Sequence, residues 1–272
     1  EIYLPYERLM HYYGLSAREA HLPFNFALIL LPWNARVIEQ AVAAYEAALP
    51  PSGWPNWVLG NHDQPRVASR VGDAQARVAA MLLLTLRGTP TIYYGDEIGM
   101  RNVPISAEQV QDPFEKRVPG EGHGRDPQRT PMQWDAGQYA GFSAAPPWLP
   151  LADDYRQLNV AVQRNAPRSL LALYRRLLAL RRSEPALSVG AYHAMSVAKD
   201  PAAQEVTLAY LREADGRRFL ITLNFSAAPV RIDISLAGAG TIALSTYLDH
   251  GGLAVNGEID LRPDEGLIIA LQ

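Results

Sequence analysis

The chain has 272 residues, of which 48% are hydrophobic, a formal net charge of -3 and no cysteine. This length can bury a substantial core and is enough for one or two domains. The slight negative charge gives no attractive field for nucleic acid, so nucleic acid is not an expected partner. The absence of cysteine excludes disulfides and thiolate metal sites and fits a reducing compartment, so we expect a cytoplasmic location. The longest apolar stretch, 78–86, is far shorter than the ~20 residues that cross a bilayer, so no membrane association is expected.

The first part of the chain alternates apolar runs with helical patterns. The expected strands lie at 1–4, 24–31, 57–60 and 91–94, and the expected helices at 6–13, 35–48 and 76–86. In the helix at 35–48, apolar residues recur at the spacing of one buried face. Such alternation predicts an α/β fold in which helices cover a parallel sheet.

The pattern changes twice further along the chain. Residues 100–151 form a long excursion without periodicity, and Trp134, Phe142 and Trp148 within it favour an ordered loop. A helix is expected at about 168–182. After Ser188 the sequence consists of short β runs with a hairpin signal at Asp215-Gly216, so residues 188–272 are predicted to form a small antiparallel β domain.

The length of the α/β part predicts half a barrel. A closed (β/α)8 barrel takes ~250 residues, and only residues 1–187 precede the β domain. Half a barrel would expose two long sheet edges. The sequence also begins without an initiator Met, in what reads as the middle of a strand. We therefore expect a fragment of a longer chain, or one half of a split enzyme, whose partner is the N-terminal half of the barrel.

Polar side chains follow two of the expected strands. Asn61, His62 and Asp63 come after 57–60, and Asp96 and Glu97 come after 91–94. In a parallel α/β barrel the active site lies at the carboxyl ends of the strands. An Asx turn that merely ends a strand would explain the first group equally well. We expect Asp96 and Glu97 to shape the rim rather than to take part in chemistry.

Four segments together resemble the α-glucosidase branch of the α-amylase superfamily, glycoside hydrolase family 13. They are Gly60-Asn-His-Asp-Gln-Pro-Arg66, Leu82 to Pro90, Tyr93-Tyr-Gly-Asp-Glu-Ile-Gly-Met100 and Gly124-Arg-Asp-Pro-Gln-Arg-Thr-Pro-Met-Gln-Trp-Asp135. The resemblance implies a (β/α)8 TIM barrel, of which residues 1–187 are the second half, followed by a C-terminal β-sandwich domain at 188–272. It also implies a retaining, exo-acting enzyme that hydrolyses terminal α-linked glucose from short oligosaccharides, with a small α-glucoside as substrate and no cofactor.

The resemblance assigns roles to acidic residues. Retaining glycosidases need a nucleophile and a general acid ~5 to 5.5 Å apart. The family pattern implies that Asp63 is a third carboxylate that stabilises the transition state, that His62 hydrogen-bonds sugar hydroxyls, and that Glu1 is the general acid. The family's nucleophile, an Asp on the fourth barrel strand, maps to no residue of this sequence. We therefore expect the 272-residue chain alone to be inactive.

Two arginines of the long excursion are further candidates. The family pattern implies that Arg125 or Arg129 holds the non-reducing glucose, and it leaves open which of them does so. The alternative is a loop-stabilising ion pair with Asp126 or Asp135. We expect Arg66 and Arg70 to form pairs at the helix start or the rim. No metal site is expected, because the histidines other than His62 lack ligand-like spacing: His11, His21, His123, His193 and His250.

Other functions remain open for this scaffold. A transglucosylase, a sucrose isomerase or a trehalose synthase would differ in how water competes with an acceptor sugar. Non-catalytic relatives serve as heavy subunits of amino-acid transporters and have typically lost the catalytic carboxylates. Retention of His62, Asp63 and Glu1 favours an enzyme. A sugar-binding β module is disfavoured, because the strands after Ser188 offer few aromatic faces.

Overall fold

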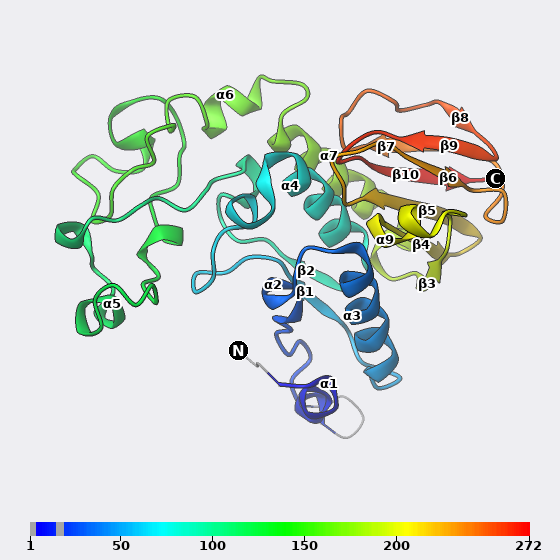
Figure 1. The fold of residues 1–272 in the computed structure, drawn as a ribbon, viewed down its shortest axis with the longest axis horizontal. Coiled ribbons are helices and arrows are strands. Elements are labelled where there is room, and N and C mark those ends of the chain that lie inside the picture. The colour runs from blue at the N-terminus through cyan, green and yellow to red at the C-terminus, as the bar shows by residue number, and fades with distance from the viewer. Residues whose placement is uncertain (1–3, 15–18) are drawn as a thin grey trace. The chain divides into compact units, whose positions relative to one another are not determined.

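A computed structural model describes residues 4–14 and 19–272 (Figure 1). The chain divides into two compact units that interleave in sequence. The first unit consists of residues 1–59, 77–91 and 175–272, and the second of residues 60–76 and 92–174. The boundary at 187 and 188 between barrel and β domain stays a prediction.

The first unit begins with helices and a pair of parallel strands. Its elements before residue 92 are α1 (Tyr6–Leu9), η1 (Met10–Tyr13), α2 (Ala27–Leu30), α3 (Ala35–Ala48), β1 (Asn56–Val58) and β2 (Thr89–Thr91). The Asn34 side chain caps α3 by accepting the N–H groups of Arg36 and Val37, so the helix predicted at 35–48 is confirmed. β1 pairs in parallel with β2, with Trp57 opposite Pro90. This pairing agrees with the α/β class.

Two strand predictions in this part need correction. The apolar run at 24–31 is not a strand, because residues Ala27–Leu30 form α2 and the Asn25 carboxamide accepts the Ala27 N–H. Phe26 and Ile29 pack on Val58, and a short apolar run fits a buried helical turn as well as a strand. The strand expected at 91–94 is β2, which ends at Thr91, so Tyr93 and Tyr94 lie beyond it.

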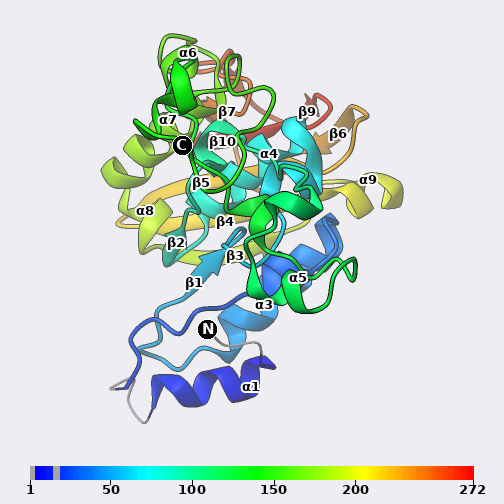
Figure 2. The same ribbon diagram turned by 90° about the vertical axis from the view of Figure 1, so that its left-hand side faces the viewer.

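The C-terminal part of the first unit is antiparallel (Figure 1; Figure 2). One sheet has the order β3-β4-β5-β10-β7-β8, and β6 pairs with β9. The bounds are β3 Ala191–Met195, β4 Thr207–Ala214, β5 Arg217–Asn224, β6 Val230–Asp233, β7 Gly240–Ser245, β8 Ala254–Val255, β9 Glu258–Leu261 and β10 Gly266–Leu271, with helices α8 (Pro185–Ser188) and α9 (Pro201–Val206). Asp215 and Gly216 join β4 to β5 with φ of 50° and 73°, as the predicted hairpin requires. The antiparallel strands predicted after Ser188 are therefore confirmed, whereas a separate domain at 188–272 stays a prediction.

Two buried guanidinium groups hold backbone carbonyls together in the first unit. Arg181 donates to the carbonyls of Leu84, Leu86, Gly88 and Leu187, and Arg212 donates to those of Thr85, Leu187, Gly190 and Ala191. No carboxylate of the described chain lies within ion-pair distance of either group. Burial lowers the pKa of both side chains to about 10, so both stay cationic at neutral pH. The last carbonyls of the helix ending at Thr85 would otherwise be buried without donors.

We expect Arg181→Met to lower the free energy of unfolding by about 3 kcal/mol or more, because several buried carbonyls lose their donors at once. Urea denaturation measures the change. Arg182→Met, at the exposed neighbouring position of the same helix, is the control and should stay within about 0.5 kcal/mol of the original chain. A loss for Arg181→Met no larger than that of the control would contradict the prediction.

The second unit is mostly loop with short helical turns (Figure 2). Its helical elements are η3 (Asp96–Ile98), η4 (Ala107–Gln109), α5 (Pro113–Arg117), η5 (Asp126–Gln128), η6 (Gln138–Gly141) and α6 (Val160–Arg164), and it shares α4 (Val67–Thr85) and α7 (Leu170–Ser183) with the first unit. One cluster of its buried hydrophobic side chains is formed by Ile98, Met100, Met132, Val160 and Leu171.

The long excursion is ordered, as predicted, but not by its aromatic residues. Trp134, Phe142 and Trp148 are exposed by 48%, 50% and 75%. Order comes instead from Met132 in the core and from buried Gln133, which donates to the Leu158 carbonyl.

Candidate functional site

The segment after β1 forms a tight turn that fixes the backbone of Asp63. The Asn61 carboxamide oxygen accepts the N–H groups of Asp63, at 3.0 Å, and of Gln64, at 2.9 Å. This is the Asx turn considered from the sequence. It uses only Asn61, so the side chains of His62 and Asp63 remain available for other contacts.

The Asp63 carboxylate is held through one of its two oxygens. Oδ1 accepts Nη2 of Arg129 at 2.7 Å and Nη1 of Arg125 at 3.4 Å, and Nε2 of His62 lies 3.4 Å from the same atom. The Asp63 side chain is 23% exposed and that of His62 is 50% exposed. Three of the predicted site residues therefore contact the carboxylate of the fourth, Asp63, which solvent can still reach.

Arg125 is anchored chiefly by a buried acid that the sequence did not indicate. Its Nε and Nη2 donate to the two oxygens of Asp112, at 2.7 and 3.0 Å, and its backbone N–H donates to Oδ2 as well. The Asp112 side chain is completely buried. The hydrogen bonds from Arg125 hold the pKa of the Asp112 carboxyl well below its usual range, and the same pair raises the pKa of Arg125.

The prediction that Asp126 or Asp135 forms a loop-stabilising ion pair with these arginines is therefore wrong. Asp126 does not bind Arg125; its Oδ2 accepts the N–H groups of Gln111 and Asp112 and so shapes the loop that carries Asp112. Asp135 accepts the N–H of Gly137 instead. Asp112 stands in a non-periodic loop, where no spacing rule points to it.

Arg129 makes fewer contacts than Arg125. Its Nε donates to the His62 carbonyl at 2.8 Å and its Nη2 donates to Asp63. Within the described part of the chain no hydrogen bond is formed by its Nη1, and the side chain is 29% exposed. Arg129 therefore combines a fixed position with a donor that a ligand could use.

Asp96 lies beside the start of this segment. Its Oδ2 approaches Gly60 so closely that a Cβ there would stand 2.8 Å from it, which explains glycine at position 60. Glu97 accepts the N–H of Gly95. Both contacts fit the expected role of Asp96 and Glu97 as shapers of the rim.

The chain matches a family model described as "Alpha amylase, catalytic domain" over residues 1–190. The chain belongs to the α-amylase family, glycoside hydrolase family 13. It is 37% identical to a salivary α-glucosidase of Anopheles gambiae, with 99% of this chain and 47% of that protein aligned. It is 35% identical to the human amino acid transporter heavy chain SLC3A1, with 96% and 38% aligned.

Solved α-amylase-fold structures agree with this assignment. A trehalulose synthase from Pseudomonas mesoacidophila MX-45 superposes with a TM-score of 0.84 at 29% identity, over 98% of this chain and 54% of that one. The fold class is thus that of the α-amylase family, a TIM barrel with an antiparallel C-terminal domain. The chain spans about half the length of the relatives that it matches.

Glu1 lies outside the described residues, so its role as general acid in this α-amylase family member stays a prediction. The roles of His62, Asp63, Arg125 and Arg129 are likewise predictions that the geometry now makes specific. In residues 4–14 and 19–272 no helix combines the length and the apolar character needed to cross a membrane. The cytoplasmic location stays a prediction.

Arg66, expected to form a pair at the helix start, is instead completely buried. Its guanidinium carbon lies 5.0 and 4.6 Å from the ring centres of Tyr93 and Tyr94, and Nη1 donates to the Tyr94 carbonyl. Arg70 donates to the Pro65 carbonyl near the start of α4. The prediction for Arg66 was wrong because stacking on aromatic rings leaves no charge pattern in the sequence.

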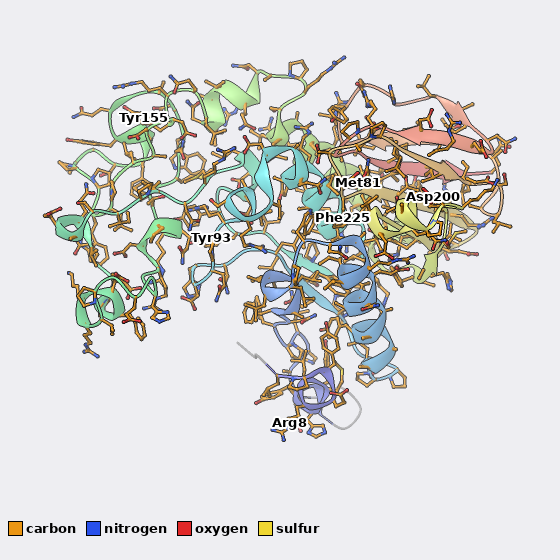
Figure 3. All side chains as sticks on the ribbon, in the orientation of Figure 1. Arg8, Met81, Tyr93, Tyr155, Asp200 and Phe225 are labelled. Carbon is orange, nitrogen blue, oxygen red and sulfur yellow. The ribbon has the colours of Figure 1, made fainter. Side chains whose placement is uncertain are left out.

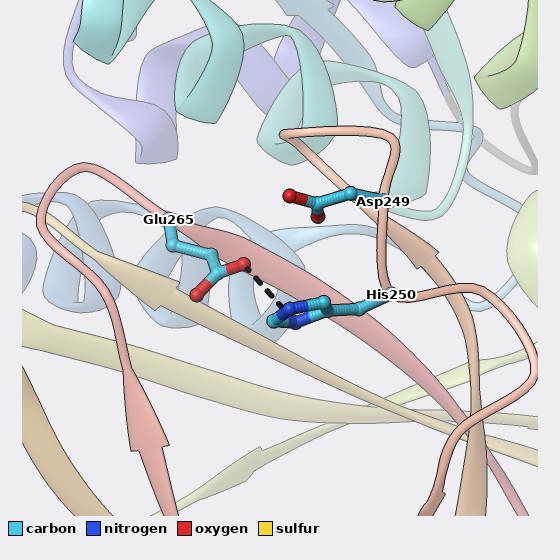
Figure 4. A group of neighbouring side chains, drawn as sticks. All are labelled: Asp249, His250 and Glu265. Carbon is cyan, nitrogen blue, oxygen red and sulfur yellow. Dashed lines mark ion pairs between the residues drawn. The ribbon is translucent and has the colours of Figure 1, made fainter.

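A second group of ionisable side chains lies in the C-terminal β region. Asp249, His250 and Glu265 bring potential metal-ligand atoms within 4.8 Å of one another (Figure 4). Arg262, however, donates to both oxygens of Asp249 at 2.8 Å and also to Glu265. Its hydrogen bonds lower the pKa of Asp249. This group is therefore an ion-pair network in which the guanidinium of Arg262 already binds the carboxylates of Asp249 and Glu265.

We expect the contribution of Asp96 to folding to decline with rising pH. Asp96 is 5% exposed, and its burial raises the pKa to about 7, against an opposing effect of Arg66. An unfolded Asp has a pKa of about 3.9, so the folded carboxyl binds a proton more tightly and this stability is lost as pH rises from about 4 through 7.

Asp96→Asn removes this dependence. The Tm of this variant minus the Tm of the original chain should therefore increase steadily between pH 5 and pH 8, and thermal unfolding measures both values. Asp153→Asn, exposed in the same unit, serves as the matched control. A Tm difference for Asp96→Asn that is constant across this range would refute the prediction.

Proposed function

We propose that the whole protein is a retaining, exo-acting α-glucosidase that releases terminal glucose from short α-linked oligosaccharides. The observation that carries this proposal is the carboxylate of Asp63, which is fixed by Arg129 and Arg125 yet remains accessible beside His62. Membership of the α-amylase family and the similarity to a salivary α-glucosidase support the reaction class.

In this proposal Asp63 stabilises the transition state. Positive charge develops on the sugar ring as the glycosidic bond breaks, and a carboxylate already fixed in place stabilises that charge without reorganising. Among the residues that the structure describes, Arg129, Arg125 and His62 contact the Asp63 carboxylate, and all three do so at Oδ1. Its Oδ2 is therefore the oxygen that faces the substrate.

Arg129 and His62 bind hydroxyl groups of the same glucose. Arg129 is the arginine proposed for sugar contact, because its Nη1 is not used by the described protein groups. Arg125 is proposed as its support, because the guanidinium is committed to Asp112. This is our proposal for the choice between Arg125 and Arg129 that the sequence leaves open.

The remaining steps follow the retaining mechanism. The carboxyl group of Glu1 donates its proton to the leaving oxygen while an aspartate outside this sequence attacks the anomeric carbon. The resulting glycosyl ester is then hydrolysed by a water molecule that Glu1 deprotonates. The catalytic unit thus requires a barrel half that supplies the nucleophile.

Two other functions remain as alternatives. The similarity to a trehalulose synthase favours transfer of glucose to an acceptor sugar in place of water. The similarity to SLC3A1 favours a non-catalytic heavy chain. Product analysis with sucrose and maltose separates them: free glucose supports the α-glucosidase, an isomeric disaccharide supports the isomerase, and unchanged sugar supports the heavy chain.

We expect Asp63→Asn in the whole protein to lower kcat for p-nitrophenyl α-glucoside by at least about 100-fold, because a neutral amide cannot offset the developing positive charge. Asp73→Asn is the matched control: it removes a carboxylate of the same unit that pairs with Arg101 at the surface. Retention of most of the activity by Asp63→Asn would exclude the proposed role.

The 272-residue chain alone should not hydrolyse p-nitrophenyl α-glucoside, because no residue in it maps to the nucleophile. The purified chain is assayed together with its Asp63→Asn variant, so that a contaminating glucosidase is recognised by activity in both. Turnover by the original chain that disappears in the variant would overturn this expectation.

A further inference from the structure

Two consecutive tyrosines bind the backbone on both sides of Arg129. The Tyr93 hydroxyl donates to the carbonyl of Gln128 at 3.1 Å, and the Tyr94 hydroxyl donates to that of Thr130 at 2.7 Å. These carbonyls belong to the residues immediately before and after Arg129. The backbone at Arg129 is therefore held at two points by side chains from the segment between β2 and η3, where Tyr93 is labelled in Figure 3.

The tyrosines are themselves fixed by a buried cation. Their rings meet edge-on, with centres 4.7 Å apart. The guanidinium of Arg66 stacks on both rings and donates to the Tyr94 carbonyl. Gly95 lies against it, since a Cβ at that position would stand 2.8 Å from Nη1 of Arg66. Cation–π contacts of this kind strengthen when water is excluded.

A second connection joins Arg66 to the same loop. The Asn102 carboxamide accepts the Arg66 backbone N–H at 2.8 Å, and its amide group lies 3.4 Å from the side-chain oxygen of buried Gln128. The Val103 N–H donates to the Pro127 carbonyl. Residues 127, 128 and 130 are thus all bound by segments distant in sequence, whereas the Arg129 side chain points to Asp63.

We propose that Tyr93 and Tyr94, supported by Arg66, are positioning residues that set the direction of the Arg129 guanidinium toward Asp63 and the substrate. Among the described residues the Arg129 side chain makes two hydrogen bonds, to the His62 carbonyl and to Asp63, and its backbone N–H donates to the Asp126 carbonyl. Small displacements of a binding group can cost a large part of the rate. The position of the Arg129 guanidinium therefore depends on its backbone, and the two tyrosine hydroxyls hold that backbone in place.

The variant Tyr93→Phe/Tyr94→Phe removes both hydroxyls and keeps the rings that stack on Arg66. The matched control is Tyr247→Phe in the first unit. Tyr247 also donates to a backbone carbonyl, that of Pro263 at 2.8 Å, and also stacks with an arginine, with Arg262 4.2 Å from its ring centre. The control thus loses the same kind of hydrogen bond away from the loop that carries Arg129.

The kinetic arm rests on the proposed function and uses the whole protein. We expect the double phenylalanine variant to lose about tenfold in kcat/KM for p-nitrophenyl α-glucoside, chiefly through KM, while Tyr247→Phe stays within about twofold. In an Arg129→Gln background the double substitution should change kcat/KM by less than about twofold, because residues that act through one group are not additive. Equal losses in both backgrounds would overturn the proposal.

The second arm does not need activity. With 15N-labelled arginine, the Nε–H resonance of Arg129 is assigned by its disappearance in Arg129→Gln. We expect its hydrogen exchange to become about tenfold faster in the double phenylalanine variant and to be unchanged in Tyr247→Phe. Unchanged exchange would overturn the positioning role even in an active enzyme, and faster exchange in an inactive protein would uphold it while rejecting the proposed function.

Discussion

The Asp63 carboxylate is where the separate segments of the second unit meet. The turn made by Asn61 fixes its backbone, and Arg129 and Arg125 bring two positions of the long excursion to the same oxygen. An exposed carboxylate would be free to rotate and would be screened by water. The contacts from the described residues hold Oδ1, so under the proposed function Oδ2 is the oxygen that stabilises the positively charged transition state.

Arginine serves two different purposes in this structure, binding backbone carbonyls and binding carboxylates. In the first unit Arg181 and Arg212 are buried and bind backbone carbonyls, so their charge is dispersed over the peptide dipoles of a helix end and a neighbouring turn. In the second unit Arg125 faces Asp112 in the two-point geometry that suits a carboxylate. The planar guanidinium with its several donors makes both uses possible, and lysine could replace neither.

The sequence predicted those features that depend on local patterns or on family motifs. The helix at 35–48, the Asp215-Gly216 hairpin and the antiparallel C-terminal strands follow from periodicity and turn chemistry, and the structure confirms them. The apolar run at 24–31 became a helix, since its length and composition do not distinguish the two structures. The α-amylase family was identified from motifs, and the family match confirms it.

The contacts around the site could not be predicted in the same way. Asp112 meets Arg125 across a non-periodic loop, and Arg66 stacks on tyrosines 27 and 28 positions away in the sequence. Both depend on the path of the chain in space. No motif favours Arg129 over Arg125, whereas their hydrogen bonds within the described residues distinguish an arginine committed to Asp112 from one that retains a donor.

A crystal structure of the whole protein with glucose bound would test the proposed role of Asp63 and Arg129. We expect one glucose ring whose hydroxyls lie within hydrogen-bonding distance of Asp63 Oδ2 and Arg129 Nη1, with the Glu1 carboxyl group beside the anomeric oxygen. A glucose that binds without contacting Asp63 and Arg129, or a Glu1 side chain directed away from the sugar, would contradict it.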